Sequence, residues 1–245
     1  VDPELKPPYD GFAPALLDDG WTVATPEAAG LDPVALEDVY VQLFDEDRFP
    51  TVRALLVVRH GKLVAEGYSR DPGDRDIPHL VQSVTKSVTS LLMGIALEEG
   101  LLDSLDTPLY TLMPEHFDDD PRKRAITLRH VLTMTDGLEF RNEDDSGAFM
   151  YVPGSSVRHM LHRPLVAEPG TRFYYHDGAP QLAAGALWAT ARQSLASFAE
   201  DHLFGPLGIT DYRWEAHEDG LSFGAYGLWL RPRDMARLGQ LMLQG

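Results

Sequence analysis

The stretch VQSVTKSVTSLLMGIALEEG, residues 81–100, contains the residues from which the fold and the function can be predicted. The chain has only four lysines, and one of them, Lys86, lies in this otherwise apolar segment between Val84 and Val88. Moving an ammonium group out of water costs free energy unless a partner compensates for the loss. Ser83 precedes Lys86 by three residues, so a helix would place both side chains on one face, about one turn apart.

A serine and a lysine in this arrangement can perform nucleophilic catalysis. A serine hydroxyl is a poor nucleophile until a neighbouring group removes its proton. Lys86 could accept that proton if desolvation by Val84 and Val88 favours the neutral amine. Ser83 falls at the predicted helix start, where backbone N–H groups favour negative charge, so its own N–H is a candidate oxyanion donor. The spacing alone is a weak signal, because a helix-capping serine followed by a solvent-reaching lysine gives the same pattern.

The rest of the sequence predicts an α+β organisation. Before residue 81 we expect an extended arm over 1–31, a helix over 33–44, and a hairpin of strands 53–59 and 63–68 that turns at His60-Gly61. The helix from Ser83 to Glu99 should end at Gly100. Further helices are expected up to the end of the sequence, one starting at Thr127 and stopping at Gly137, together with a short strand over 225–230. We expect one domain over 32–245, with 32–80 as the start of its α/β part and 81–245 as its mainly helical part.

Composition excludes several classes of function. The net charge is −17, and the 21 basic residues comprise 17 Arg and four Lys, which argues against nucleic acid or an anionic membrane surface as a partner. The sequence contains no cysteine, so disulfides, thiolate metal sites and a cysteine nucleophile are excluded. No run approaches the ~18 apolar residues of a membrane span. No leader is visible, and both an exported and a cytoplasmic location stay open.

A succession of motifs resembles one family of enzymes. The segments SVTKSVTSLLMGIALEEGLLDSLDTPL, ITLRHVLTMTDGL, EPGTRFYYHDGAPQLAAGAL, LFGPLGIT and YGLWLRPRDMARLGQLML occur in this order. Together they resemble the serine hydrolases of the β-lactamase and penicillin-binding-protein superfamily, in particular class C β-lactamases, related esterases and 6-aminohexanoate-dimer hydrolase. The resemblance covers residues 50–245. It implies a β-lactamase/transpeptidase-like fold, with an antiparallel sheet, flanking helices and a helical region.

The resemblance also implies a mechanism. Ser83 would form an acyl-enzyme with a small-molecule ester or amide, and Lys86 would be the general base, alone or shared with a tyrosine. No metal or organic cofactor is implied. Tyr175, after P-G-T-R-F, matches the family's tyrosine; Tyr174 is the alternative and would point the opposite way in strand-like backbone.

The residues after Tyr175 depart from the family pattern. The family commonly has asparagine where this chain has Asp177, and a carboxylate there would hold Lys86 protonated and make it a worse base. Asp177 is therefore expected to touch Lys86 or substrate. His176 could be a catalytic group, and the alternative is a histidine that lies on the surface or supports the catalytic groups.

The family's third motif, K-T-G or H-x-G on a late strand, is absent up to Gly245. We therefore expect the sheet to lack its later strands, and the polypeptide to continue or to pair with a C-terminal fragment. The substrate stays open among ester, β-lactam, peptide and linear amide. A non-catalytic, ligand-binding relative with the same fold is the alternative.

Three other features have simpler explanations. GLSFG, around Ser222, matches the G-x-S-x-G elbow but lacks the apolar strand before it that this elbow requires. His159 and His162 have a metal-ligand spacing without an implied third ligand. Acidic stretches such as NEDDSG (142–147) are predicted to be solvated loops.

Overall fold

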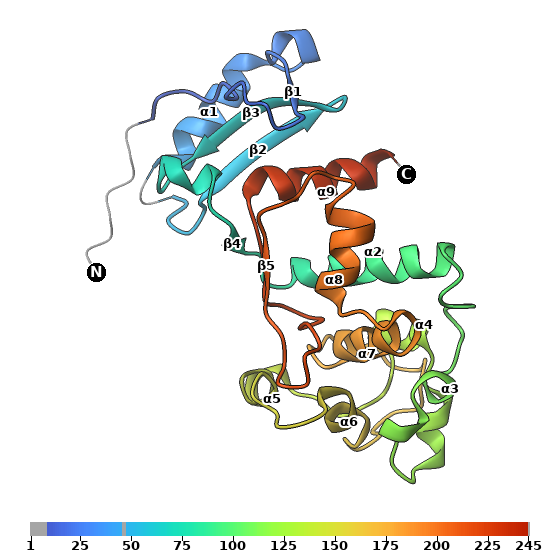
Figure 1. The fold of residues 1–245 in the computed structure, drawn as a ribbon. Helices are drawn as coiled ribbons and strands as arrows, with labels where there is room; N and C mark the ends of the chain where they lie inside the picture. Colours follow the sequence, from blue (N-terminus) through green and yellow to red (C-terminus); the bar gives the residue numbers. More distant parts are fainter. Residues whose placement is uncertain (1–8, 46–47, 245) are drawn as a thin grey trace. The chain divides into compact units, whose positions relative to one another are not determined.

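The computed structural model of the chain describes residues 9–45 and 48–244. They form two compact units, each of which is considered by itself (Figure 1). Unit 1 consists of Val1–His79, Leu207–Tyr212 and Trp229–Gly245, and unit 2 consists of Leu80–Pro206 and Arg213–Leu228. The sequence-based division into an arm over 1–31 and one domain over 32–245 stays a prediction.

Unit 1 is built on a three-stranded sheet. Its elements are β1 (Thr22–Val23), η1 (Glu27–Ala29), α1 (Pro33–Leu43), β2 (Ala54–Arg59), β3 (Lys62–Tyr68), η2 (Pro72–Arg75) and α9 (Pro232–Gln244). Strands β2 and β3 are antiparallel, and β1 adds to β3 in parallel, giving the order β1–β3–β2. The turn residues His60 and Gly61 both have positive φ, 52° and 73°, as a tight two-residue hairpin requires. The predicted hairpin is confirmed.

Helix α1 follows from its local sequence. The Asp32 side chain caps the helix by accepting the Val34 N–H at 2.9 Å, and proline occupies the first turn. Tyr40 is fully buried and packs so closely on the sheet that a Cβ at Gly67 would lie 2.7 Å from its ring. The predicted helix is therefore confirmed.

The N-terminal segment is more structured than the predicted extended arm. It contains the 3₁₀ turn η1 and the strand β1, which pairs with β3. Phe12 stacks on Tyr40 with ring centroids 5.2 Å apart. The expectation of a plain arm was wrong for these residues because their apolar side chains and backbone find partners on the hairpin.

A buried charge network connects α9 to this sheet. The Arg233 side chain is 5% exposed and donates to Glu66 Oε1 at 2.7 Å and to Asp19 Oδ2 at 2.7 Å. Both carboxylates raise the pKa of Arg233, against the lowering effect of its burial. Because each buried charge has a partner, removal of one member would leave an uncompensated ion.

Unit 2 is mainly helical. Its helices and the strand β5 are α2 (Val84–Glu98), α3 (Leu109–Leu112), η3 (Pro114–His116), η4 (Pro121–Ala125), α4 (Leu128–Leu132), α5 (Asn142–Phe149), α6 (Ser156–Leu161), α7 (Ala179–Ala191), α8 (Leu195–Ala199), the π-helix η5 (Glu200–Phe204) and β5 (Arg213–Trp214). Helix α7 is at the centre: its first nine residues are all buried, and it contacts α2, α4, α6 and α8. Among the described helices, none has the length and apolar character needed to cross a membrane.

Two short strands complete the fold. Strand β6 (Leu228–Leu230) pairs with β4 (His79–Leu80) on one side and with β5 on the other, in the order β4–β6–β5. The expected strand over 225–230 is therefore confirmed only for its second half. Gly224, just before it, packs against α7 so tightly that a Cβ there would lie 2.2 Å from the carbonyl oxygen of Pro180.

Helix boundaries in unit 2 mostly agree with the sequence predictions. Helix α2 follows Ser83, and Gly100 has the predicted left-handed conformation with φ of 72°. Thr127 caps α4 and accepts the N–H of His130. The predicted stop at Gly137 was wrong, because α4 ends at Leu132. Gly137 instead lies against the chain near Ala167, where a Cβ would be 2.1 Å from a carbonyl oxygen.

An aromatic cluster in unit 2 encloses a histidine. His217 is 5% exposed, and its ring lies 4.9 Å from that of Phe149 and 4.4 Å from that of Phe223. Among the described residues, neither of its ring nitrogens has a hydrogen-bond partner. Burial lowers the pKa of His217 to about 4, from an ordinary value of 6.5. The unfolded chain therefore takes up this proton at a higher pH than the folded protein does.

We expect the His217→Leu variant to resist mild acid better than the parent. The free energy of unfolding contributed at this position falls as the pH drops from 6.5 to about 4, and the loss amounts to about 2 kcal/mol at pH 5. Urea unfolding at pH 7.5 and pH 5 measures this difference. A His162→Leu variant, altered at an exposed histidine, is the control. An equal loss of stability at pH 5 in His217→Leu and the parent would contradict the assignment.

Candidate active site

Three oxygen atoms from three separate segments accept hydrogen bonds from the largely shielded side chain of Lys86. Its Nζ lies 3.0 Å from Ser83 Oγ, 2.7 Å from Asp177 Oδ1 and 3.1 Å from the carbonyl oxygen of Ala225. The Lys86 side chain is only 10% exposed. A protonated lysine has three N–H donors, so this environment satisfies all of them. The ion pair with Asp177 thus compensates for the free-energy cost of placing a charged lysine in an apolar helix.

Ser83 occupies the N-cap position of α2 with its hydroxyl available to Lys86. Its side chain makes no capping hydrogen bond to the helix backbone, and the residue is exposed. The preceding residue, Gln82, has a positive φ of 47°, an uncommon and strained conformation for a non-glycine residue. This turn brings Ser83 to the start of the helix, where an incoming carbonyl group can reach it.

Buried contacts along α2 hold the Ala225 carbonyl in place. Thr89 Oγ1 donates to the carbonyl oxygen of Gly224 at 2.8 Å, and the Gly224 N–H donates to Gln181 Oε1 of α7 at 3.0 Å.

Of the two valines expected to desolvate Lys86, Val88 is 1% exposed. The expectation for Val84 was wrong, because it is 40% exposed and lies on the outer side of the first turn.

Tyr175 and Tyr174 make contacts with different partners, as predicted. The ring of Tyr175 lies over Lys86, with Nζ 4.9 Å from its centroid, in a cation–π contact. Tyr174 instead stacks on His176, with ring centroids 6.3 Å apart. The structure therefore places the ring of Tyr175, rather than that of Tyr174, over Lys86.

His176 is turned into the interior of unit 2. It is 2% exposed, and its Nε2 lies 2.9 Å from Oδ2 of Asp136, which is itself fully buried. The surface location that the sequence left open was therefore wrong. His176 is placed to anchor the segment between Tyr175 and Asp177.

Asp177 bridges Lys86 and helix α5. Its second oxygen, Oδ2, accepts the hydroxyl of Ser146 at 2.7 Å, and its backbone N–H donates to Asn142 Oδ1 at 3.1 Å. Sequence reasoning missed Asn142 and Ser146 because their acidic segment was taken for a solvated loop. The available signal was the spacing of two small polar residues at i and i+4, which places them on one helix face.

Tyr226 adds an uncharged neighbour to this network. Burial, followed by the negative charge of Asp177, raises the pKa of Tyr226 well above its ordinary value. The phenol therefore stays protonated at neutral pH. The negative charge that pairs with Lys86 therefore comes from Asp177 and not from Tyr226.

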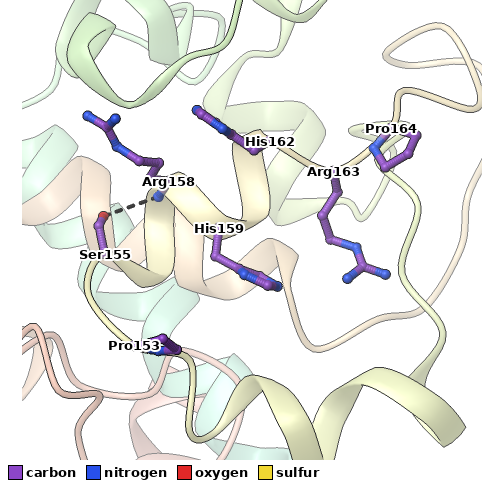
Figure 2. Close-up of a pocket in the computed structure, with 7 residues that line it drawn as sticks. All are labelled: Pro153, Ser155, Arg158, His159, His162, Arg163 and Pro164. Atoms are coloured by element: carbon purple, nitrogen blue, oxygen red, sulfur yellow. Dashed lines mark hydrogen bonds between the residues drawn. The ribbon is translucent and has the colours of Figure 1, made fainter.

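The features with simpler explanations lie elsewhere in unit 2. Ser222 is 2% exposed, and its Oγ accepts the Ala196 N–H at 3.1 Å, which is a structural role. His159 and His162 line a surface cleft of about 570 Å³ with Arg158 and Arg163, and Figure 2 shows the two imidazoles projecting in different directions from α6. No cluster of three or more potential metal ligands is found among residues 9–45 and 48–244.

Comparison with known proteins identifies the family. A family model described as Beta-lactamase matches residues 36–245. The chain belongs to the beta-lactamase family. A Bacillus anthracis structure named as a 6-aminohexanoate-dimer hydrolase superposes with a TM-score of 0.71 at 21% identity, covering 98% of this chain and 65% of that one. The predicted α+β, β-lactamase/transpeptidase-like fold is therefore confirmed.

Curated members of the beta-lactamase family with related sequences include fungal proteins. Lovastatin esterase of Penicillium rubens is 28% identical over 200 residues, which is 72% of this chain and 49% of the relative. Monacolin J acid methylbutanoyltransferase of Aspergillus terreus is 30% identical over 165 residues, 58% of this chain and 39% of the relative. The chain thus spans less than half the length of these two relatives.

The Lys86–Asp177 contact predicts a change in pH dependence. Replacing Asp177 by asparagine keeps the shape of the side chain and removes the charge that favours the ammonium form of Lys86. In Asp177→Asn, the acid limb of the pH–rate profile should therefore move to lower pH. The measurement is the rate of covalent labelling of the intact protein by a fluorophosphonate across pH 5–10. An unchanged limb would show that Asp177 does not control the protonation of Lys86.

Proposed function

We propose that the protein is an acyl-transfer serine hydrolase that forms an acyl-enzyme on Ser83. The observation that carries the proposal is the 3.0 Å contact between Ser83 Oγ and Lys86 Nζ at the exposed start of α2. A nucleophile within hydrogen-bond distance of a group oriented by a third residue is the arrangement that such catalysis requires. Here Asp177 orients Lys86, and Tyr175 lies over it.

The proposed reaction begins with attack of Ser83 Oγ on the carbonyl carbon of the substrate. With Lys86 as the neutral amine, the Ser83 proton passes to the Lys86–Tyr175 pair, and the backbone N–H of Ser83 faces the developing oxyanion. Collapse of the intermediate breaks the bond to the leaving group, which takes the proton from the same pair. Water then attacks the acyl-enzyme and releases the acid, regenerating Ser83.

The resting site favours esters as substrates. Asp177 Oδ1 at 2.7 Å and two further oxygens around Nζ all accept hydrogen bonds from Lys86, an arrangement that suits a proton donor better than a base. An alkoxide or phenoxide leaves with less help from an acid than an amine does, so ester cleavage demands less of this site. The names of the relatives, an esterase and acyltransferases, support the same substrate class.

A panel of chromogenic substrates tests the proposal. The intact protein should hydrolyse short-chain nitrophenyl esters faster than a cephalosporin or an aminohexanoate amide dimer. Ser83→Ala should abolish turnover, whereas Ser90→Ala, at an exposed serine of the same helix, should retain it. Absence of turnover with every member would favour the alternative, a non-catalytic ligand-binding relative.

Tyr175→Phe should slow ester hydrolysis while leaving the fold intact. The phenyl ring preserves the contact with Lys86, but the hydroxyl that exchanges protons is lost. Removal of one general acid/base group typically costs ~10²–10⁴-fold in rate. Tyr174→Phe is the matched control and should remain active. Full activity in Tyr175→Phe would remove Tyr175 from the mechanism.

A further inference from the structure

We propose that Asn142 and Ser146 of α5 are positioning residues that fix the Tyr175–Asp177 segment against Lys86. The proposal rests on the proposed function, because the segment matters to catalysis only if Ser83 is the nucleophile. Neither residue belongs to the motifs that identify the family, and neither contacts Ser83 or Lys86 in the hydrogen bonds of the described residues.

Asn142 holds the backbone on both sides of His176. Its Nδ2 donates to the carbonyl oxygen of Tyr175 at 3.3 Å, and its Oδ1 accepts the N–H of Asp177 at 3.1 Å. One amide side chain therefore satisfies a backbone acceptor and a backbone donor two residues apart. This fixes the direction in which the Tyr175 and Asp177 side chains leave the backbone.

Ser146 acts on the carboxylate itself. Its hydroxyl donates to Asp177 Oδ2 at 2.7 Å, while Lys86 donates to Oδ1 at 2.7 Å. The carboxylate is thus held at both oxygens and cannot rotate without losing one bond. Ser146 Oγ also lies 3.3 Å from Asn142 Oδ1, so the two side chains are adjacent, and the single hydroxyl proton of Ser146 goes to the nearer oxygen, that of Asp177.

Helix α5 owes its position to contacts with the rest of unit 2. Its sequence, NEDDSGAF, is rich in residues of low helix propensity, and its N-cap residue makes no side-chain capping bond. Phe149 is 3% exposed and packs edge-on to Phe140, and Asp145 pairs with Arg163 of the segment after α6 at 2.7 Å. These contacts hold α5, and with it Asn142 and Ser146, in a fixed position.

The two residues should affect different parts of the pH–rate profile. The titratable groups around Asp177 are Lys86 of α2, which pairs with it, Tyr175, which lies over Lys86, and Tyr226, whose pKa Asp177 raises. The α5 side chains bonded to Asp177 are the uncharged Asn142 and Ser146, and the acidic Asp145 of α5 pairs with Arg163. Without the Ser146 hydroxyl, Asp177 loses one hydrogen-bond donor, and its ion pair with Lys86 becomes stronger. Loss of Asn142 loosens the backbone without changing that charge.

The experiment compares four variants of the intact protein: Ser146→Ala, Ser146→Thr, Asn142→Ala and, as a control on the exposed face of α5, Glu143→Gln. The rate of labelling by a fluorophosphonate is measured from pH 5 to 10. Ser146→Ala should move the acid limb to higher pH, and Ser146→Thr, which keeps the hydroxyl, should restore it. Asn142→Ala should lower the plateau by about 10–100-fold with the limb in place.

A second readout separates this proposal from the proposed function. Amide hydrogen exchange of residues 175–178, followed by mass spectrometry, should quicken in Asn142→Ala and not in Glu143→Gln, whether or not Ser83 is reactive. If no protein is labelled, the parent included, but the exchange pattern is as expected, the catalytic function is overturned. The positioning contact is then still supported. The positioning roles would be overturned if both alanine variants had the same acid limb, plateau and exchange rates as Glu143→Gln.

Discussion

The site depends on one constraint: the ammonium group of Lys86 has left bulk water and must be surrounded by acceptors. A buried, unpaired charge costs several kcal/mol, so folding of unit 2 favours arrangements that bring oxygens to Nζ. Ser83 supplies one oxygen from the same helix, whereas Asp177 and Ala225 are 91 and 139 residues away in sequence. The need to surround the lysine with acceptors therefore brings together Ser83, Asp177 and the loop before β6.

The identity of the carboxylate changes what this arrangement can do. An amide at residue 177 would share hydrogen bonds with Lys86 without charge, whereas the carboxylate of Asp177 pairs with it and favours the ammonium form. The pair is shielded, with side chains 10% and 16% exposed, so water screens the attraction little. The proposed reaction on Ser83 therefore takes place beside a charged carboxylate.

Local chemistry explains which features could be predicted from the sequence. The Ser83–Lys86 spacing, the Asp32 cap and the His60-Gly61 turn each depend on residues within a few positions of one another, so the sequence displays them directly. Tyr175 could be chosen over Tyr174 because neighbouring residues of an extended segment face opposite ways. The fold class followed from the order of motifs along the chain.

The remaining features depend on contacts between distant segments. The Ala225 contribution is a backbone carbonyl, which carries no side-chain signature. Helix α5 has a sequence typical of a solvated loop and is helical because Phe149 and Asp145 are anchored elsewhere. Gly137 resembled a helix stop, yet its small size is needed for close approach to Ala167. Each of these errors came from a tertiary contact that overrode a local preference.

The most direct test of the account is to locate the covalent adduct. The intact protein is treated with a fluorophosphonate and digested, and the labelled peptide is sequenced by mass spectrometry, beside a Lys86→Met variant whose fold is checked by circular dichroism. The account predicts label on Ser83 alone, formed at least ~10²-fold more slowly in the variant. Label on Ser222 or another serine, or equal labelling of a folded Lys86→Met protein, would contradict it.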